Sequence, residues 1–394
     1  MTSTKSFDGN MVFEALEKKK MNIDLKSKED RNNLRQDFLD CQQKSLSNSR
    51  ESDYHFNKLI KTWDLISEIL WAQGYWKHYL ECGNIALNCA TQLKKRDIEG
   101  RILNELGWAQ MEQEEFDIAQ RCFSDSLQVF EEIGDRIGQG QSLRYLGVLH
   151  FRRRYFGLAL KCYQDALTIV QEELEMLQEE LKLKPLDRRL NEMNQRVLHQ
   201  QAELHNVLGN LYLKLWNVNT SRQEFIAGLQ GFRNLQKLYI SPTPSSYLYF
   251  QPAPLLNLGR VAMLSRRYHK AQHYFDRCYR LCERIDRPDT KAGVLFRMAE
   301  LAKLQGKNKE AEELAKKAEK IVGDEVPPLR NRARNFRDQM KGVRREQLKA
   351  LRHKIRMFVT LTIDLLVNAP LVLLQSIGYY ALFLGAKLVA KMRR

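Results

Sequence analysis

Residues 103–127 are LNELGWAQMEQEEFDIAQRCFSDSL, and residues 143–167 are LRYLGVLHFRRRYFGLALKCYQDAL. When the two stretches are aligned, similar residues match at a constant separation of 40 positions. The matched pairs are Leu106 and Leu146, Gly107 and Gly147, Phe116 and Phe156, Ala119 and Ala159, Phe123 and Tyr163, and Leu127 and Leu167. Such a period, with small residues at two places and large apolar residues between them, is typical of paired helices that stack on copies of themselves. The two stretches therefore predict an all-α solenoid whose Gly and Ala positions mark close helix crossings.

The composition agrees with a helical chain. Among 394 residues there are only 9 Pro and 20 Gly, and 43% of the residues are hydrophobic. Leu, Glu, Lys, Arg and Gln, which are good helix formers, are abundant. We therefore expect helix over most of the length and almost no strand.

The repeat extends in both directions. One period before Leu106 lies Ile66, in a degenerate copy where Tyr79 replaces the small crossing residue and Gly83 replaces the aromatic residue. The large and small residues have exchanged places one turn apart there, which preserves the packed volume. Later copies begin at the pairs Leu208-Gly209, Leu258-Gly259 and Met298-Ala299. The sequence predicts about five helix pairs between residues 60 and 323.

An insertion breaks the period after the copy at Leu146. Leu208-Gly209 follows 62 positions after Leu146-Gly147, an excess of 22, and helical apolar spacing continues on both sides of Pro185. We interpret residues of about 171–203 as two helices lengthened by about 11 residues each, which projects them roughly 16 Å beyond the array. An intrachain hairpin and a self-associating coiled coil both fit this pattern.

The pattern resembles the tetratricopeptide repeat, in which Leu-Gly, Ala, an aromatic residue and Ala-Leu follow in this order. The usual period of that family is about 34, so the units here have a longer link. The longer link resembles the kinesin-light-chain and bacterial signalling-array type, in which a Gly-Asp-Arg segment joins the units. Here that segment is Gly134, Asp135 and Arg136.

The resemblance implies where a partner binds. In tetratricopeptide arrays the first helix of each pair lines a concave groove that binds extended peptides or helices. The corresponding positions here are Asn104, Trp108, Met111, Arg144, Val148, Phe151, Asn206, Asn210, Lys214, Asn257, Arg260 and Met263. Asn side chains bond a peptide backbone in both directions, and Arg and Lys favour an acidic ligand. The alternative is that Trp108, Val148 and Phe151 only pack between units.

The ends of the chain differ from the array. We expect residues 1–28 to be disordered, residues 29–59 to form a capping helix, and the array to cover residues 60–323 with a Pro-containing loop at 240–254. A basic linker helix is expected at 324–356, followed by an apolar tail at 357–394.

Positive charge gathers near the C-terminus. The chain carries a net charge of +16, of which residues 341–394 contribute +9, from 11 Lys or Arg against Glu346 and Asp364. Clustered cations beside an apolar run favour anionic lipid as the partner. Nucleic acid is the weaker alternative, because no stacking-aromatic motif accompanies the charge.

The apolar tail is long enough to span a bilayer. Residues 365–386 hold 22 residues without a charge, about 33 Å as a helix against a hydrocarbon thickness of about 30 Å. Seven Lys or Arg precede the run and four follow it, so the array is expected on the cytoplasmic side. A single span and a hairpin broken at Pro370 both remain open. The residues predicted to associate with the membrane are Leu365, Leu366, Leu371, Leu374, Ile377, Leu382 and Phe383.

No catalytic constellation is recognisable. The sequence holds no phosphate loop, no Gly-x-Ser-x-Gly and no His-Glu-x-x-His. His269 and His273 share a helical face but have no third ligand. Three of the seven Cys are spaced by 40 and occupy one repeat position, as small buried residues do. We expect no enzyme activity, no metal and no cofactor.

These observations favour a non-enzymatic adaptor, held at a membrane by its C-terminus and binding a protein partner. One alternative is a soluble sensor of the signalling-array type, whose apolar tail mediates oligomerisation or autoinhibition. Another, the detached repeat arm of a signalling ATPase, has no nucleotide-binding motif in this sequence to support it.

Overall fold

The computed structural model describes residues 52–72, 76–238, 250–285, 288–322 and 327–368, and within these ranges every regular element is a helix. The helices are α3 (Ser52–Ala72), α4 (Trp76–Gln92), α5 (Arg96–Glu112), α6 (Phe116–Glu132), α7 (Arg136–Arg152), α8 (Phe156–Leu183), α9 (Arg188–Lys214), α10 (Val218–Leu238), α11 (Pro252–Leu264), α12 (Tyr268–Arg284), α13 (Pro288–Leu304), α14 (Asn308–Val322) and α15 (Pro327–Asn368).

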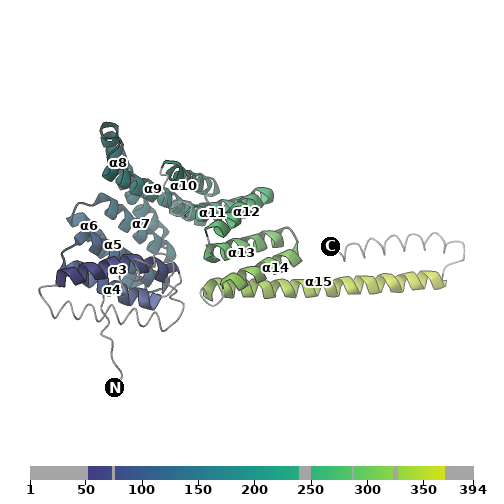
Figure 1. The fold of residues 1–394 in the computed structure, drawn as a ribbon. Helices are drawn as coiled ribbons and strands as arrows, with labels where there is room; N and C mark the ends of the chain where they lie inside the picture. Colours follow the sequence, from purple (N-terminus) through teal and green to yellow (C-terminus); the bar gives the residue numbers. More distant parts are fainter. Residues whose placement is uncertain (1–51, 73–75, 239–249, 286–287, 323–326, 369–394) are drawn as a thin grey trace, which may run out of the picture.

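The helices stack as consecutive antiparallel pairs, from α3 with α4 to α13 with α14 (Figure 1). Six such pairs lie within the described residues, against about five predicted. The first helices also contact one another across the pairs, from α5 to α7, α9, α11 and α13 in turn, whereas the second helices make no comparable contact among themselves. The first helices therefore form the inner row of a solenoid.

In four of the six described pairs, from α5 with α6 to α11 with α12, the crossing depends on a glycine against an aromatic ring. A Cβ atom added at Gly107 would lie 2.7 Å from the Phe123 ring, and one at Gly209 would lie 2.6 Å from the Phe225 ring. Gly147 with Tyr163 and Gly259 with Phe275 repeat this arrangement at the same separation of 16 residues. The Leu-Gly positions are the close crossings that the sequence predicts.

The first pair has the exchanged packing expected from its sequence. Gly83 on α4 lies against the side chains of Trp63 and Leu106, and Tyr79 packs edge-on against Trp63 with 4.7 Å between ring centroids. Trp63 is fully buried. A large residue on α3 thus fills the space that an aromatic residue on the second helix fills in the later pairs.

Within this chain, the insertion forms a hairpin of α8 and α9. The outer turns of α8 and α9 pack against each other within one hydrophobic cluster, and Pro185 lies in the turn between them. At the tip, Leu183 and Leu186 are 83% and 94% exposed. Figure 1 shows the hairpin projecting beyond the neighbouring pairs. The residues that pack between the two arms include Leu174, Leu177, Leu190 and Met193.

Three predicted boundaries differ from the helices. The predicted boundary between the capping helix and the array, at residue 59, falls inside α3. Phe56 and Leu59, on the N-terminal side of this boundary, belong to the buried cluster that α3 forms with α4 and α5. The loop predicted at 240–254 ends earlier, because α11 begins at Pro252, where a helix tolerates proline in its first turn. The predicted boundary between the basic linker helix and the apolar tail, at residue 356, lies within α15, which continues to Asn368. Residues 1–28 and most of the predicted capping helix lie outside the described residues.

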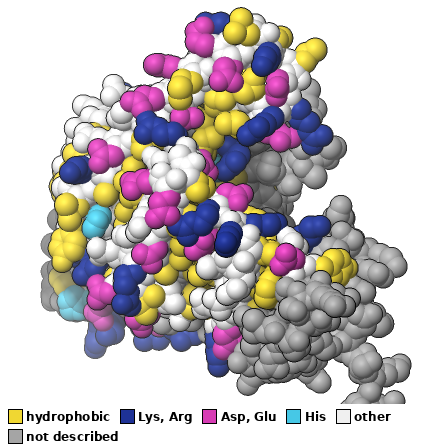
Figure 2. All heavy atoms as spheres, turned by 90° about the vertical axis from the view of Figure 1, so that its left-hand side faces the viewer, with side chains coloured by type: hydrophobic (Ala, Val, Ile, Leu, Met, Phe, Trp, Pro, Cys, Tyr) yellow, Lys and Arg dark blue, Asp and Glu magenta, His cyan; other side chains and the backbone are white. Residues whose placement is uncertain are grey.

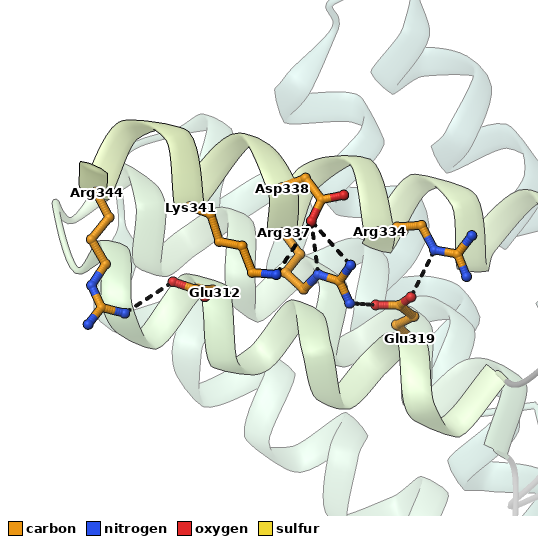
Figure 3. Close-up of polar contacts among 7 residues, drawn as sticks. All are labelled: Glu312, Glu319, Arg334, Arg337, Asp338, Lys341 and Arg344. Atoms are coloured by element: carbon orange, nitrogen blue, oxygen red, sulfur yellow. Dashed lines mark hydrogen bonds and ion pairs between the residues drawn. The ribbon is translucent and has the colours of Figure 1, made fainter. Parts of the chain in front are cut away.

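α15 closes the array by packing on α14. Ala333 and Met340 are buried. The ring of Phe336 lies edge-on to that of Phe296 on α13, with 5.5 Å between the ring centroids. Ion pairs flank this seam, as Figure 3 shows: Glu319 accepts from Arg334 at 3.0 Å and from Arg337, and Glu312 accepts from Arg344 at 3.2 Å. Beyond the last turn that touches α14, no other described helix lies beside α15 (Figure 1).

Within the described residues, no helix combines the length and apolar character that a membrane crossing needs. Leu365 and Leu366 lie in the final turn of α15. The other residues predicted to associate with a membrane, namely Leu371, Leu374, Ile377, Leu382 and Phe383, lie outside the described residues.

Candidate functional site

Polar side chains link the first helices along the inner row. Between α5 and α7, the Asn104 amide donates a hydrogen bond of 3.0 Å to the Ser142 hydroxyl. Ser142 lies 3.0 Å from the hydroxyl of Ser126, which donates to the carbonyl oxygen of Gly100 at 2.7 Å. All three polar side chains are buried. They hold adjacent units together from the inside and are not presented to a partner.

Between α7 and α9 the link is an ion pair. Arg144 contacts Glu203 at 2.6 Å, and its guanidinium also lies 4.4 Å from the centre of the Tyr145 ring. Burial acts to lower the pKa of Arg144, but Glu203, with smaller contributions from Tyr145 and Tyr163, outweighs it and the pKa is raised. The positive charge of Arg144 is therefore already neutralised within the chain.

Between α9 and α11 the link contains no carboxylate. The Asn257 amide donates to Asn206 Oδ1 at 3.3 Å, and Arg260 donates to Asn257 Oδ1 at 2.8 Å and to Asn210 Oδ1 at 3.4 Å. Asn210 in turn donates to the carbonyl oxygen of Asn206 at 3.1 Å. We call these four residues, Asn206, Asn210, Asn257 and Arg260, the amide–arginine cluster.

Arg260 carries a poorly compensated charge. Burial first, and then the positive charge of Arg297 on α13, lower the pKa of Arg260 to about 10. The negative charge of Glu300 raises the pKa of Arg260, but the Glu300 carboxylate is already paired with Arg297 at 2.7 Å. Among the described residues no carboxylate contacts Arg260. A half-buried cation held only by neutral amides is a favourable place for an external anion.

The predicted groove residues differ in burial. Asn104 and Met111 are 1% and 0% exposed, and Arg144 and Asn257 are also buried. Trp108, Val148 and Phe151 are half-buried and pack against hydrophobic clusters. Asn206, Asn210, Arg260 and Met263 are half-buried as well, and Lys214 is exposed. The polar members that are not fully buried therefore lie towards the C-terminal half of the row.

Sequence reasoning missed three residues of this inner row: Ser142, Glu203 and Arg297. Glu203 is the counter-ion of Arg144, but it lies in α9, beyond the insertion that breaks the period, so no repeat position pointed to it. Arg297 directly precedes Met298-Ala299, the counterpart of Leu258-Gly259. Its place directly before this pair is the sequence feature that could have identified Arg297 as a residue of the inner row.

Other candidate chemistry is sparse in the described residues. His269 and His273 are exposed on α12, and no group of three His, Cys, Asp or Glu residues there is placed to hold a metal ion. The cysteines in these ranges are free thiols. Cys278, for example, is buried and donates to the carbonyl oxygen of Pro252 at 3.2 Å.

Comparison with known families identifies the repeat. A family profile described as tetratricopeptide repeat matches residues 99–172 and 251–322. The first stretch spans α5 to α7 and the inner half of α8, and the second spans α11 to α14. The chain therefore contains tetratricopeptide repeats on both sides of the projecting hairpin.

Solved structures with a similar arrangement are distant in sequence. BtubC (BKLC) from P. vanneervenii is 17% identical, with a TM-score of 0.46, over 65% of this chain and 92% of that one. The human IFIT1 dimer with m7Gppp-AAAA is 14% identical, with a TM-score of 0.46, over 91% of this chain and 69% of that one. The assembly chaperone of RpL4 (Acl4) is 16% identical, with a TM-score of 0.39, over 73% and 99%. No curated protein matches the chain.

Proposed function

Because the chain contains tetratricopeptide repeats, which act in protein–protein interaction, we propose that it is a non-catalytic adaptor. Its inner row of first helices binds an extended peptide or a helix of a protein partner. The amide–arginine cluster on α9 and α11 is the centre of this site, and the partner segment is acidic.

One observation carries the proposal: Arg260 has only amide partners, while comparable arginines in the described array contact carboxylates. Arg144 pairs with Glu203 at 2.6 Å and Arg101 with Asp64 at 2.6 Å. A carboxylate beside Arg260 would raise its pKa from about 10 towards the ordinary value and complete its hydrogen bonds. Charged hydrogen bonds of this kind contribute about 1.5–3 kcal/mol each.

Asn206 and Asn210 are suited to the backbone of the same segment. Both are half-buried on α9, and an amide side chain donates and accepts hydrogen bonds. Lys214 is exposed one turn further along the helix and extends the positive character of the site. The N-terminal half of the row offers a partner fewer polar groups, since Asn104 and Arg144 are buried and already bonded to other residues of the chain.

Selection of random peptides displayed against the full chain tests the proposal. We expect the selected peptides to be enriched in Asp and Glu. Arg260→Gln should raise their Kd at least tenfold, because glutamine keeps hydrogen bonds to the amides but removes the charge. Asn206→Ala and Asn210→Ala should each cost about 0.5–1.5 kcal/mol of binding.

Arg222→Gln is the matched control, because Arg222 is exposed on α10, a second helix. It removes the same charge from the outer row and should leave Kd unchanged. Peptides without acidic residues, or equal binding by the parent and Arg260→Gln with the fold intact by circular dichroism, would refute the site.

We also propose that the C-terminus tethers the array to the cytoplasmic face of a membrane. The support is in the sequence, where residues 365–386 carry no charge and the preceding cations outnumber those that follow. Alkaline extraction of membranes from cells that express the full chain should leave it in the pellet. A cysteine placed after Arg394 then separates a span, which exposes it on the far side, from a hairpin that returns to the cytoplasm.

Recovery of the full chain in the soluble fraction without detergent would contradict the tether. It would favour the alternative in which the apolar tail mediates oligomerisation or autoinhibition of a soluble regulator. Size-exclusion chromatography of the full chain and of a chain ending at Asn368 would then separate these two roles.

A further inference from the structure

α15 carries a regular row of cations that extends into its free part, which lies beyond Gln347, the last residue hydrogen-bonded to α14. Lys341, Arg345, Lys349, Arg352 and Arg356 follow one another in steps of four, four, three and four residues. This spacing places them on one face of the helix, over a length of about 22 Å. We call these five residues the cationic stripe.

The contacts with α14 fix the rotation of this helix. Arg334, Arg337 and Arg344 turn towards Glu319 and Glu312 of α14 (Figure 3), while Ala333 and Met340 are buried. The last contact is a hydrogen bond of 3.0 Å from Asn308, the first residue of α14, to Gln347. The helix beyond Gln347 therefore leaves the array in a defined orientation.

The ion pairs that are described for the stripe are weak ones at the surface. Lys341 lies 3.7 Å from Asp338, and both side chains are exposed. Arg345 and Arg352 are exposed, and neither forms an ion pair or hydrogen bond with a described residue. Lys349 contacts Glu346 at 2.8 Å, but both side chains are more than 70% exposed, and such a surface pair contributes little. Glu346 is the one carboxylate between Lys341 and Arg356. A large positive potential therefore surrounds this part of α15.

Apolar side chains accompany the cations. Leu348, Met357 and Val359 are 44%, 58% and 48% exposed, which is unusual for a helix that leaves the body of the protein. Figure 2 shows a different pattern on the array itself, where acidic and basic side chains are intermixed over the visible face. Cations beside exposed aliphatic groups are typical of a helix that lies at a lipid interface.

We propose that the cationic stripe binds the anionic headgroups of a lipid surface and that the free part of α15 lies along this surface. The stripe ends at Arg356, and the sequence then becomes apolar, with Asp364 as the one charge up to residue 386. Nucleic acid fits less well, because the stripe carries no aromatic side chain for stacking and aliphatic side chains lie beside it. The proposal refines the membrane tether and rests on it for the position of the surface.

Partitioning of the full chain onto vesicles tests the proposal. One set of vesicles is phosphatidylcholine, and the other contains one third phosphatidylserine. Each cation near an anionic surface contributes about fivefold to partitioning. The triple variant Arg345→Gln, Lys349→Gln, Arg352→Gln should therefore lose about a hundredfold on the anionic vesicles and change little on the neutral ones.

The matched control removes three cations from the tip of the α8–α9 hairpin, as Lys182→Gln, Lys184→Gln, Arg188→Gln. These side chains are exposed and far along the chain from α15. The control has the same net charge as the stripe variant and should partition like the parent. Unchanged circular dichroism in both variants shows that the fold is retained.

The outcomes separate the stripe from the tether. If the chain binds neutral vesicles and phosphatidylserine does not strengthen this binding, the proposed headgroup binding by the stripe is wrong, and the membrane tether is supported. Binding to anionic vesicles alone, lost in the stripe variant, keeps the stripe and overturns the tether. If the stripe variant and the hairpin control lose the same amount of partitioning onto anionic vesicles, then net charge alone explains the loss, and the proposed role of the stripe is wrong. The parent chain could instead bind single-stranded RNA and no vesicles, and lose this RNA binding in the stripe variant. That result would assign the stripe to nucleic acid and overturn the proposal.

Discussion

At the residue scale, the turns that join the described helices repeat one backbone conformation. In seven of them the second residue after the helix has a positive φ, and in five of these it is not glycine: Lys94, Glu114, Arg154, Trp216 and Arg266, at φ 56–65°. The N–H of Gly134 bonds the carbonyl oxygen of Glu131 at 3.2 Å, and that of Asp135 bonds Phe130 at 2.9 Å, which satisfies the end of α6. The geometry repeats even where the residue type is unfavourable, because the hydrogen bonds offset the strain.

Gly134→Ala tests this balance. Gly134 has φ +69° and no atom within 4 Å of an added Cβ, so the substitution acts through the backbone alone. It should lower the free energy of unfolding by about 1–2 kcal/mol. Gly157→Ala is the control, because Gly157 is equally unobstructed but helical, and it should raise the free energy by about 0.5–1 kcal/mol. Urea denaturation distinguishes the two, and a shift of the same sign in both variants would contradict the assignment.

At the element scale, four of the six described helix pairs are held by a glycine on the first helix and an aromatic ring on the second. Phe123, Tyr163, Phe225 and Phe275 are almost completely buried against the glycines that precede them by 16 residues. Burial of one such side chain contributes about 1.5–3 kcal/mol. The close crossing therefore depends on the absence of a side chain at the glycine.

Gly147→Leu should disrupt the crossing of α7 and α8. An added side chain would overlap the Tyr163 ring, which is 1% exposed and enclosed on all sides. We expect a loss of about 1–3 kcal/mol or more, measured as a lower midpoint of thermal unfolding. Gly157→Leu adds the same atoms where nothing lies within 4 Å and should have a small effect. A Gly147→Leu protein that melts like the parent would show that the crossing has been misidentified.

At the scale of the whole molecule, the inserted hairpin separates two tetratricopeptide stretches that still behave as one array. α7 and α9 remain in contact across the insertion, and the buried pair of Arg144 and Glu203 joins them. Because the stability of a repeat array is shared between neighbouring units, this pair couples its two halves.

Arg144→Met should lower the free energy of unfolding by about 3–5 kcal/mol, because Glu203 is then left partly buried without a counter-ion. The double variant Arg144→Met, Glu203→Met removes both charges and should recover most of this loss. Urea titrations followed by circular dichroism measure both variants. A double variant no more stable than Arg144→Met alone would indicate that packing, and not the buried charge, sets the cost.

Much of the architecture follows from the order of amino acids alone. The period of 40, the Leu-Gly pairs and the rings 16 residues later predict the helix pairs, because each crossing forms between residues close in the sequence. The same locality holds for the hairpin, whose two arms meet around Pro185. The change from basic to apolar residues after residue 356 does not end α15, which continues to Asn368, because a change of composition alone does not end a helix.

The availability of the polar residues depends on contacts between units, which the repeat pattern does not contain. Asn104, Arg144 and Asn206 occupy the same position, two residues before a Leu-Gly pair, yet Ser142 and Glu203 from the next first helix bond to Asn104 and Arg144, which are buried. Arg260 meets only amides and the neighbouring Arg297. The rotation and spacing of successive first helices place these partners, because each helix is turned by the packing of the whole unit beneath it.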